Sequence, residues 1–243
     1  MYEIAPLLDD PLHNLKTIRD IYRWAITEME TAEISFGHGC NDSFEESSFL
    51  ICRALKLPFE HFDEFLDAAL THNELLRLVN LIDRRVHEKT PSAYLLKEAW
   101  LTNHQFYIDE RALIPRSYIA ELLEDDLAPW IEDPYEVGSV LDLCTGSGCL
   151  AILAQGAFPN AAVTGSDISA DALEVAKINR HDYGMDDTLE LVQGDLFSAL
   201  EGRTFDLILS NPPYVTTASM EALPTEYRHE PSLALAAGAD GMD

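Results

Sequence analysis

The sequence predicts an α/β protein in which a parallel, doubly wound sheet follows a helical first half. Up to Pro91, apolar residues recur at helical spacing, and from Ser139 onward short apolar runs alternate with helical stretches. The apolar run at 205–210 is followed by Pro212 and Pro213, which cannot donate hydrogen bonds to a strand ladder. The last of these strands is therefore expected to end before the prolines.

Four amphipathic helices are predicted in the first half of the chain from the helical spacing of its apolar residues. They span residues 15–33, 44–57, 59–70 and 74–88. Ser43 and Glu46 have the spacing of a capping box ahead of the second helix, and Asn73 is the expected N-cap of the fourth. This part of the chain is therefore expected to form a small helical bundle.

A different period marks residues 100–114. Phe106 and Ile108 alternate with polar neighbours, which is typical of a strand, so a β-hairpin is expected here. Ser117 can then cap a helix that is predicted to end near Pro129.

The second half alternates strand and helix. Strands are expected at 139–143, 162–166, 188–192 and 205–210. Helices are expected at 149–158 and 170–183, with a shorter turn near 198–201.

Net charge is the strongest feature of the composition. The chain has 243 residues, of which 43 are acidic and 16 are basic, giving a formal net charge of -27. So acidic a surface repels phosphate backbones, which makes free nucleic acid a poor partner. A basic protein is the expected partner, because opposite net charges steer association. The alternative is that the acidity serves solubility alone.

Other features bear on the compartment. No apolar run approaches the ~18 residues that a membrane helix needs, and Met1–Ile4 lacks the features of a secretory signal, so no membrane association and a cytoplasmic location are expected. The cysteines have neither metal-type spacing nor the density of a disulfide scaffold, so reduced thiols and no metal are expected. They are Cys40, Cys52, Cys144 and Cys149.

A glycine turn joins the first predicted strand of the second half to its helix. Gly146, Gly148 and Ala151 satisfy the pattern G-x-G-x-x-A, in which small residues let the backbone approach a ligand at a helix N-terminus. Asp167 follows about 20 residues later, where an acid can hold a ribose diol. Asp142 precedes the turn, where a carboxylate suits a ligand ammonium better than a pyrophosphate. Together these residues favour S-adenosylmethionine over a dinucleotide.

The ends of the last two strands complete the predicted site. Asp195, Leu196 and Phe197 could bind the adenine amine and flank its ring. Asn211–Tyr214 offers an amide, proline carbonyls and an aromatic ring, which together can hold a planar amide or amine group. In an open α/β sheet, ligands bind beyond the carboxyl ends of the strands, so all these residues should meet in one crevice. Methyl transfer to a nitrogen is the predicted reaction.

Ordinary structural roles remain open for each of these motifs. Gly146 and Gly148 could serve only a tight turn, and Asp167 or Asp195 could be a helix cap. The stretch Asn211–Tyr214 could be a simple turn that ends a strand.

The chain resembles the bacterial protein-glutamine methyltransferases over nearly its whole length. Their shared features are a helical N-terminal domain, a hairpin linker and an S-adenosylmethionine-dependent, Rossmann-like domain of seven strands that carries Asn-Pro-Pro-Tyr, here at 211–214. Residues 91–95, 99–100 and 114–122 look like the branch that modifies protein L-three of the large ribosomal subunit.

This resemblance implies roles for individual residues. Asn211 and the carbonyl of Pro212 would hold the glutamine amide, Pro213 would border the substrate, and Tyr214 would pack on it; Asn211, Pro212 and Tyr214 are the expected catalytic residues. The expected cofactor-binding residues are Asp142, Cys144, Thr145, Gly146, Ser147, Gly148, Asp167, Ile168, Asp195, Leu196, Phe197 and Asn211.

The resemblance also implies a domain division. Residues 1–98 would form a helical substrate-recognition domain, 99–116 a β-hairpin linker, and 117–243 a methyltransferase domain that continues in the family through three further strands. Three alternative functions stay open at this point. They are methylation of a glutamine in peptide chain release factors, methylation of an adenine amine in nucleic acid, and recruitment of a ribosomal protein without chemistry.

Overall fold

The computed structural model describes residues 9–242, which form two compact units. One unit contains the described residues up to Leu96 together with Pro224–His229, and the other contains Lys97–Leu223 and the described residues from Glu230 onward. The first four residues, in which no secretory signal was expected, lie outside the described range. The domain roles predicted for 1–98, 99–116 and 117–243 stay predictions, and the compact units differ from that division in placing 224–229 with the helices.

The first unit is the expected helical bundle. Its helices are α1 (Asp9–Asn14), α2 (Ile18–Thr31), α3 (Ser43–Leu55), α4 (Phe62–Phe65, preceded by the 3-10 turn Phe59–His61), α5 (His72–His87) and α6 (Ser92–Leu96). Buried apolar residues of α2, α3 and α5 form one core, in which Ile21, Leu50 and Leu78 are fully enclosed. The apolar stripes read from the sequence therefore face each other, as amphipathic helices require.

Two predicted helix starts in this unit are wrong. Asp42, rather than Ser43, caps α3 by accepting a hydrogen bond from the backbone N–H of Glu45. Thr71, rather than Asn73, caps α5 in a capping box with Glu74. Each true cap lies one or two residues before the predicted one, because several polar residues at each start can accept a bond from the first turn.

The single helix predicted over 59–70 is also wrong. Only 59–65 is helical, because the backbone from Leu66 to Leu70 bonds to the start of α2 instead. The N–H of Ile18 donates to the Ala68 carbonyl, and the N–H of Leu70 donates to the Lys16 carbonyl. A tertiary contact thus takes the backbone groups that a longer helix would have used.

Arg85 of α5 is the centre of a buried ionic cluster in this unit. Its guanidinium binds both carboxylate oxygens of Glu46 at 2.6 and 3.1 Å and lies 3.6 Å from a carboxylate oxygen of Glu226. It also donates to the carbonyl of Ser35 at 3.0 Å. Glu46, read from the sequence as part of a capping box, instead accepts bonds from Arg85 and Ser92 in the interior.

The second unit is the expected α/β fold. A short hairpin of β1 (Ala99–Leu101) and β2 (His104–Phe106) leads to α7 (Tyr118–Glu124) and the 3-10 turn η3 (Pro134–Glu136). Next come β3 (Ser139–Leu143), α8 (Cys149–Ala157), β4 (Ala162–Asp167), α9 (Ala170–Asp182), β5 (Leu189–Gln193), η4 (Ser198–Leu200) and β6 (Leu207–Ser210). The chain continues through α10 (Thr217–Ala222), η5 (Thr225–His229) and η6 (Ser232–Ala234).

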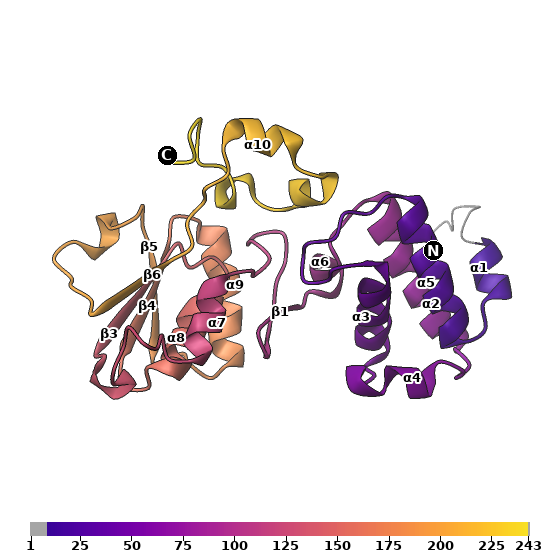
Figure 1. Cartoon of the computed structure of the whole chain (residues 1–243), viewed down its shortest axis with the longest axis horizontal. Helices are drawn as coiled ribbons and strands as arrows, with labels where there is room; N and C mark the ends of the chain where they lie inside the picture. The colour runs from indigo at the N-terminus through magenta and orange to yellow at the C-terminus, as the bar shows by residue number, and fades with distance from the viewer. Residues whose placement is uncertain (1–8, 243) are drawn as a thin grey trace. The chain divides into compact units, whose positions relative to one another are not determined.

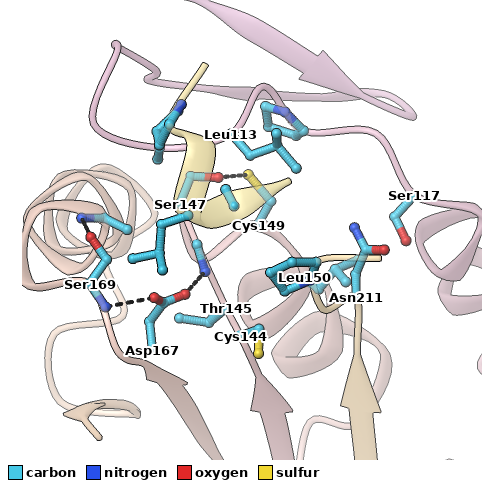
Figure 2. Close-up of a pocket in the computed structure, with 18 of the residues that line it drawn as sticks. Leu113, Ser117, Cys144, Thr145, Ser147, Cys149, Leu150, Asp167, Ser169 and Asn211 are labelled. Atoms are coloured by element: carbon cyan, nitrogen blue, oxygen red, sulfur yellow. Dashed lines mark hydrogen bonds between the residues drawn. The ribbon is translucent and has the colours of Figure 1, made fainter. Parts of the chain in front are cut away.

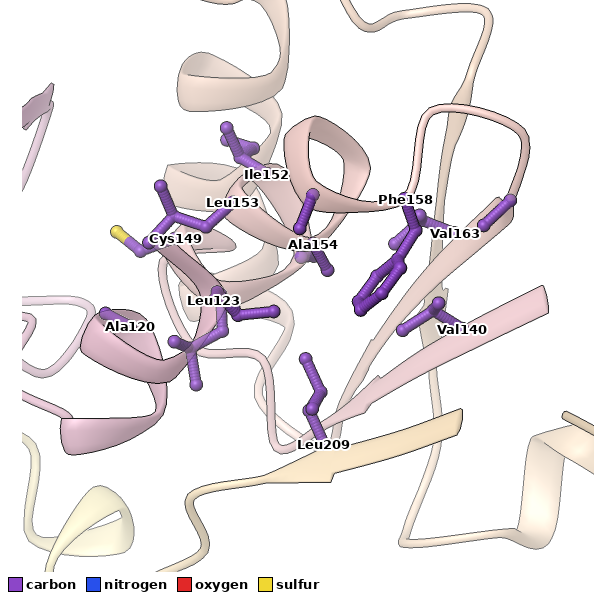
Figure 3. Packing of buried hydrophobic residues seen from close by; sticks show 14 of the residues in the cluster. Ala120, Leu123, Val140, Cys149, Ile152, Leu153, Ala154, Phe158, Val163 and Leu209 are labelled. Carbon is purple, nitrogen blue, oxygen red and sulfur yellow. The ribbon is translucent and has the colours of Figure 1, made fainter. Parts of the chain in front are cut away.

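The four long strands form a parallel sheet in the order β5-β4-β3-β6. Figure 1 shows α7, α8 and α9 on the same side of this sheet. Phe158 is fully buried between α8 and the strands, beside Val140 and Val163 (Figure 3). The predicted α/β fold class with a parallel sheet is confirmed, and β6 ends at Ser210 as the two prolines require.

The hairpin strands are shorter than the 100–114 stretch suggested. After Phe106 the backbone no longer pairs with the other hairpin strand. The N–H of Tyr107 donates to the side-chain oxygen of Asn179 in α9, and the buried amide of Asn179 donates to the carbonyl of Tyr107. The amide of Asn179 also donates to the carbonyl of Ser147 at 2.9 Å, and so joins the hairpin exit to the glycine turn.

Arg85→Met tests the ionic cluster. The change leaves Glu46 and Glu226 buried without their cation, and we expect the free energy of unfolding to fall by about 3–5 kcal/mol. Chemical denaturation measures this. The matched control is Arg84→Met at the preceding position of the same helix, where the ion pair with Glu88 is exposed and its loss should cost less than ~1 kcal/mol. Equal losses in the two variants would contradict the account.

Candidate active site

A cavity opens beyond the carboxyl ends of β3, β4 and β6 in the second unit. The space within it, including its open mouth, is about 840 Å³. Predicted residues that line it are Cys144, Thr145, Gly146, Ser147, Asp167, Ile168, Asn211 and Pro213. Figure 2 shows the glycine turn, the end of β4 and Asn211 around one space. The ends of β3, β4 and β6 thus meet at one cavity, as the sheet topology predicts.

The glycine loop, defined here as residues 144–148, has a positive backbone φ at three residues, namely Cys144 (+62°) and the two glycines. Gly146 has φ +56° and Gly148 has φ +80°, which glycine adopts without steric cost. A side chain at Gly148 would lie 3.1 Å from the Cβ of Ala176 in α9, so this glycine lets loop and helix pack closely. A side chain at Gly146 would meet nothing within 4 Å, so this glycine presents bare backbone to the cavity.

Asp167 is held in place at the end of β4. One carboxylate oxygen accepts the N–H of Gly146 at 2.8 Å, and the other accepts the N–H of Ser169 at 2.9 Å (Figure 2). The helix that follows is capped by Ser169, which accepts the N–H of Ala172. Asp167 therefore does not act as the cap of α9, and its carboxylate borders the cavity with capacity to accept further bonds.

Asp142 lies beneath the glycine loop rather than in the cavity wall. It is fully buried, and one of its oxygens accepts the hydroxyl of Thr145 at 2.5 Å and the N–H of Ala151 at 3.0 Å. Its second oxygen has no hydrogen-bond partner among residues 9–242. Burial raises the pKa of Asp142 to about 7, against the opposing effect of these hydrogen bonds. Its predicted contact with a ligand ammonium stays a prediction, beside an evident role in holding the loop.

Asn211 occupies the boundary between two cavities. It lines the large cavity and also a neighbouring space of about 290 Å³ that Pro212 and Tyr214 border. The hydroxyl of Ser210 donates to the carbonyl of Leu143, which fixes the start of the turn against β3. Tyr214 is 70% exposed, so its ring is open to a partner.

The third predicted strand end contributes less to the cavity. Asp195, Leu196 and Phe197 are all exposed and do not line either cavity. They follow β5, whose end is paired with that of β4. The prediction that they contact an adenine ring stays a prediction.

Sequence reasoning missed two walls of the large cavity. One is the segment after the hairpin, with Arg111–Leu113 and Pro115–Ser117, and the other is Pro231 with Leu233 and Ala234. Neither wall has a periodic pattern or a motif of known spacing. The signal that could have indicated the first wall was its place at the end of the predicted hairpin, where Arg116 stands beside Pro115.

Ion pairs hold these two walls. Arg111 binds both oxygens of Asp109, which also accepts the hydroxyl of Tyr107, and this holds the pKa of Asp109 at about 2. Arg116 binds the two oxygens of Glu230 at 2.8 and 2.7 Å. This pair joins the two walls, with the carboxylate of Glu230 fully buried and the side chain of Arg116 partly exposed.

Three further observations concern the described residues alone. Residues 9–242 contain no group of three or more His, Cys, Asp or Glu side chains placed to hold a metal ion. The four cysteines are free thiols, and burial raises the pKa of Cys144, which lines the large cavity, to about 11. Within the same range, every helix is too short or too polar to cross a bilayer.

Comparisons with known proteins point first to a class of protein, the methyltransferases. A model of the Methyltransferase small domain matches residues 123–226. Among solved structures, the chain is similar to an S-adenosylmethionine-dependent methyltransferase from Agrobacterium tumefaciens at 23% identity and a TM-score of 0.38, over 48% of this chain and 39% of that one.

Curated relatives specify the family. Ribosomal protein uL3 glutamine methyltransferases from Burkholderia pseudomallei and Bordetella pertussis are 52% and 54% identical to the chain, over 94% of it and over 76% and 77% of their own lengths. The enzyme of that name from Francisella tularensis is 42% identical over 96% of this chain and 74% of its own. The chain belongs to the family of ribosomal protein uL3 glutamine methyltransferases, which confirms the resemblance found in its sequence.

The buried carboxyl of Asp142 predicts a pH-dependent stability. Between about pH 4 and pH 7 the unfolded chain ionises this group while the folded protein keeps its proton, so stability falls as pH rises. Asp142→Asn removes this contribution. We expect the stability of the wild type relative to Asp142→Asn to fall by on the order of 2–3 kcal/mol between about pH 5 and pH 8. Urea denaturation without ligand measures it, and a constant difference would contradict the assignment.

Proposed function

We propose that this chain transfers the methyl group of S-adenosylmethionine to the side-chain amide nitrogen of a glutamine in ribosomal protein uL3. The observation that carries this proposal is the position of Asn211 on the boundary of two cavities. The larger one has the glycine loop and Asp167 on its walls, and the smaller one has Pro212 and Tyr214. A donor in the first and an amide in the second would meet at Asn211.

The residues of the large cavity fit the cofactor. Gly146 presents open backbone, and the anchored carboxylate of Asp167 can accept the two hydroxyls of a ribose. Ile168 is half-exposed beside it and can cover an adenine ring. When bound, S-adenosylmethionine supplies a methyl group on a sulfonium, which is a strong electrophile with a good leaving group.

The turn Asn211–Tyr214, called the clamp below, handles the substrate in this proposal. An amide nitrogen is a poor nucleophile because its lone pair is delocalised. The side-chain oxygen of Asn211 and the carbonyl of Pro212 would accept its two hydrogens, which orients the nitrogen and stabilises positive charge that develops on it. Tyr214 would pack against the amide, and good alignment alone can be worth roughly 7–11 kcal/mol.

Proton loss follows the transfer in this scheme. Among the described residues that line the smaller cavity, none has a carboxylate or imidazole side chain that could act as a base. The nitrogen is positively charged and acidic once it carries the methyl group. Its proton can then pass to solvent, which reaches the smaller cavity beside the exposed Tyr214.

The nature of the partner belongs to the same proposal. The relatives are named for their action on a ribosomal protein, and the net charge of -27 favours a basic protein over free nucleic acid. A cytoplasmic location, where such a protein is made, follows from this substrate.

Methyl transfer to purified uL3 tests the function directly. We expect Asn211→Ala to lower the single-turnover rate by ~10²–10³, because one preorganised polar contact to the transition state is lost. Tyr214→Phe should be milder, since stacking needs the ring more than the hydroxyl. Melting temperatures should change little, because the clamp is a loop end. A folded Asn211→Ala protein with full activity would exclude Asn211 from catalysis.

A further inference from the structure

Residues 215–238, called the strap below, leave the clamp and return to it. The N–H of Val215 donates to the carbonyl of Leu235, and the N–H of Ala237 donates to the carbonyl of Val215, both at 2.9 Å. The N–H of Thr217 also donates to the carbonyl of Gly238 at 2.8 Å. The two ends of the strap are therefore joined directly beside Tyr214, so the position of one end fixes the other.

The tip of the strap belongs to the other compact unit. Pro224–His229 groups with the helices, although Leu223 and Glu230 group with the sheet. Glu226 in this tip is 2% exposed, accepts the N–H of Ser35 at 2.9 Å and faces Arg85.

Two neighbours of Glu226 add contacts of their own to the helical unit. The ring of Tyr227 lies 4.4 Å from that of His38, and His229 contacts the carbonyl of Glu88 at 2.9 Å. The tip is thus held by an ionic contact, a ring contact and a hydrogen bond.

A second buried carboxylate holds the strap in the sheet unit. Glu230 binds Arg116 and accepts the N–H of Ile114, and the next residue, Pro231, lines the large cavity. Glu226 and Glu230 are four residues apart, and each meets an arginine of a different unit. Within this short stretch, one carboxylate is therefore held by the helical unit and the other by the sheet unit.

We propose that Glu226 and Tyr227 are positioning residues for methyl transfer: the helical unit sets the geometry of the clamp by holding the tip of the strap. This inference rests on the proposed function for its kinetic consequence. Anchoring the tip restrains the strap. Because the two ends of the strap are joined at Val215, this restraint acts on Val215 and on Tyr214, the residue before it.

Two glycines of one loop provide a matched pair of variants. Gly37 (φ +147°) and Gly39 (φ +106°) both have backbone angles that strain an alanine. A Cβ at Gly37 would lie 2.8 Å from the hydroxyl oxygen of Tyr227, whereas a Cβ at Gly39 would meet nothing within 4 Å. Gly37→Ala therefore pushes against the ring of Tyr227 in the strap tip, and Gly39→Ala controls for the strain. Glu226→Gln is an independent way to weaken the same anchor.

The experiment compares these variants in methyl transfer to uL3 and in amide hydrogen exchange. We expect Gly37→Ala and Glu226→Gln to lower kcat about 10-fold relative to Gly39→Ala, since small misplacements of reacting groups are costly, with the Kd for S-adenosylmethionine within about twofold. The amide of Val215 should exchange faster in these two variants alone.

Each result decides between explanations. Equal kcat and equal exchange in Gly37→Ala and Gly39→Ala would overturn the proposal, as would a loss confined to KM, which would indicate substrate binding only. If the wild type does not methylate uL3, the proposed function fails, and the exchange of Val215 still decides whether the strap transmits the anchor.

Discussion

Parallel alignment of β3, β4, β5 and β6 is the constraint on which the site depends. Because the strands run in one direction, the residues that follow each of them lie along one edge of the sheet. The glycine loop, Asp167 and Asn211 are thereby brought together from positions far apart in the chain. The two prolines after Asn211 give this edge a stiff end, since they fix their own backbone angles and cannot extend β6.

Buried polar contacts convert this edge into an enclosed cavity. Asp142 holds the glycine loop from below, and Asn179 holds it from the side of α9. Arg116 and Glu230 join the two walls that come from outside the sheet. Hydrogen bonds and ion pairs are strongest where water is excluded, and a buried polar group left without its partner is costly. Removing one partner of these contacts is therefore expected to disturb the cavity wall.

The sequence was sufficient for the features that follow from local chemistry. Apolar periodicity identified the sheet strands to within two residues, the double proline fixed the end of β6, and the glycine and acid spacing located Asp167. The sequence was insufficient where a contact between residues distant in the chain decides the local structure. Helix 59–70 was overestimated because residues 66–70 bond to the start of α2, and Glu46 was mistaken for a capping residue because its partner Arg85 is distant in sequence. The walls at 111–117 and 231–234 carry no periodic signal, since ion pairs place them.

The central claim is that the enzyme methylates a glutamine of uL3 that is held by the clamp at the end of β6. The most direct measurement is a mass spectrum of uL3 from ribosomes of the source cell, compared with uL3 from a strain whose chromosomal copy encodes Asn211→Ala. The account predicts that uL3 from the parent strain carries the added mass of one methyl group on a glutamine-containing peptide, and that this mass is absent from the variant strain. An identical methylated glutamine in both strains would contradict it.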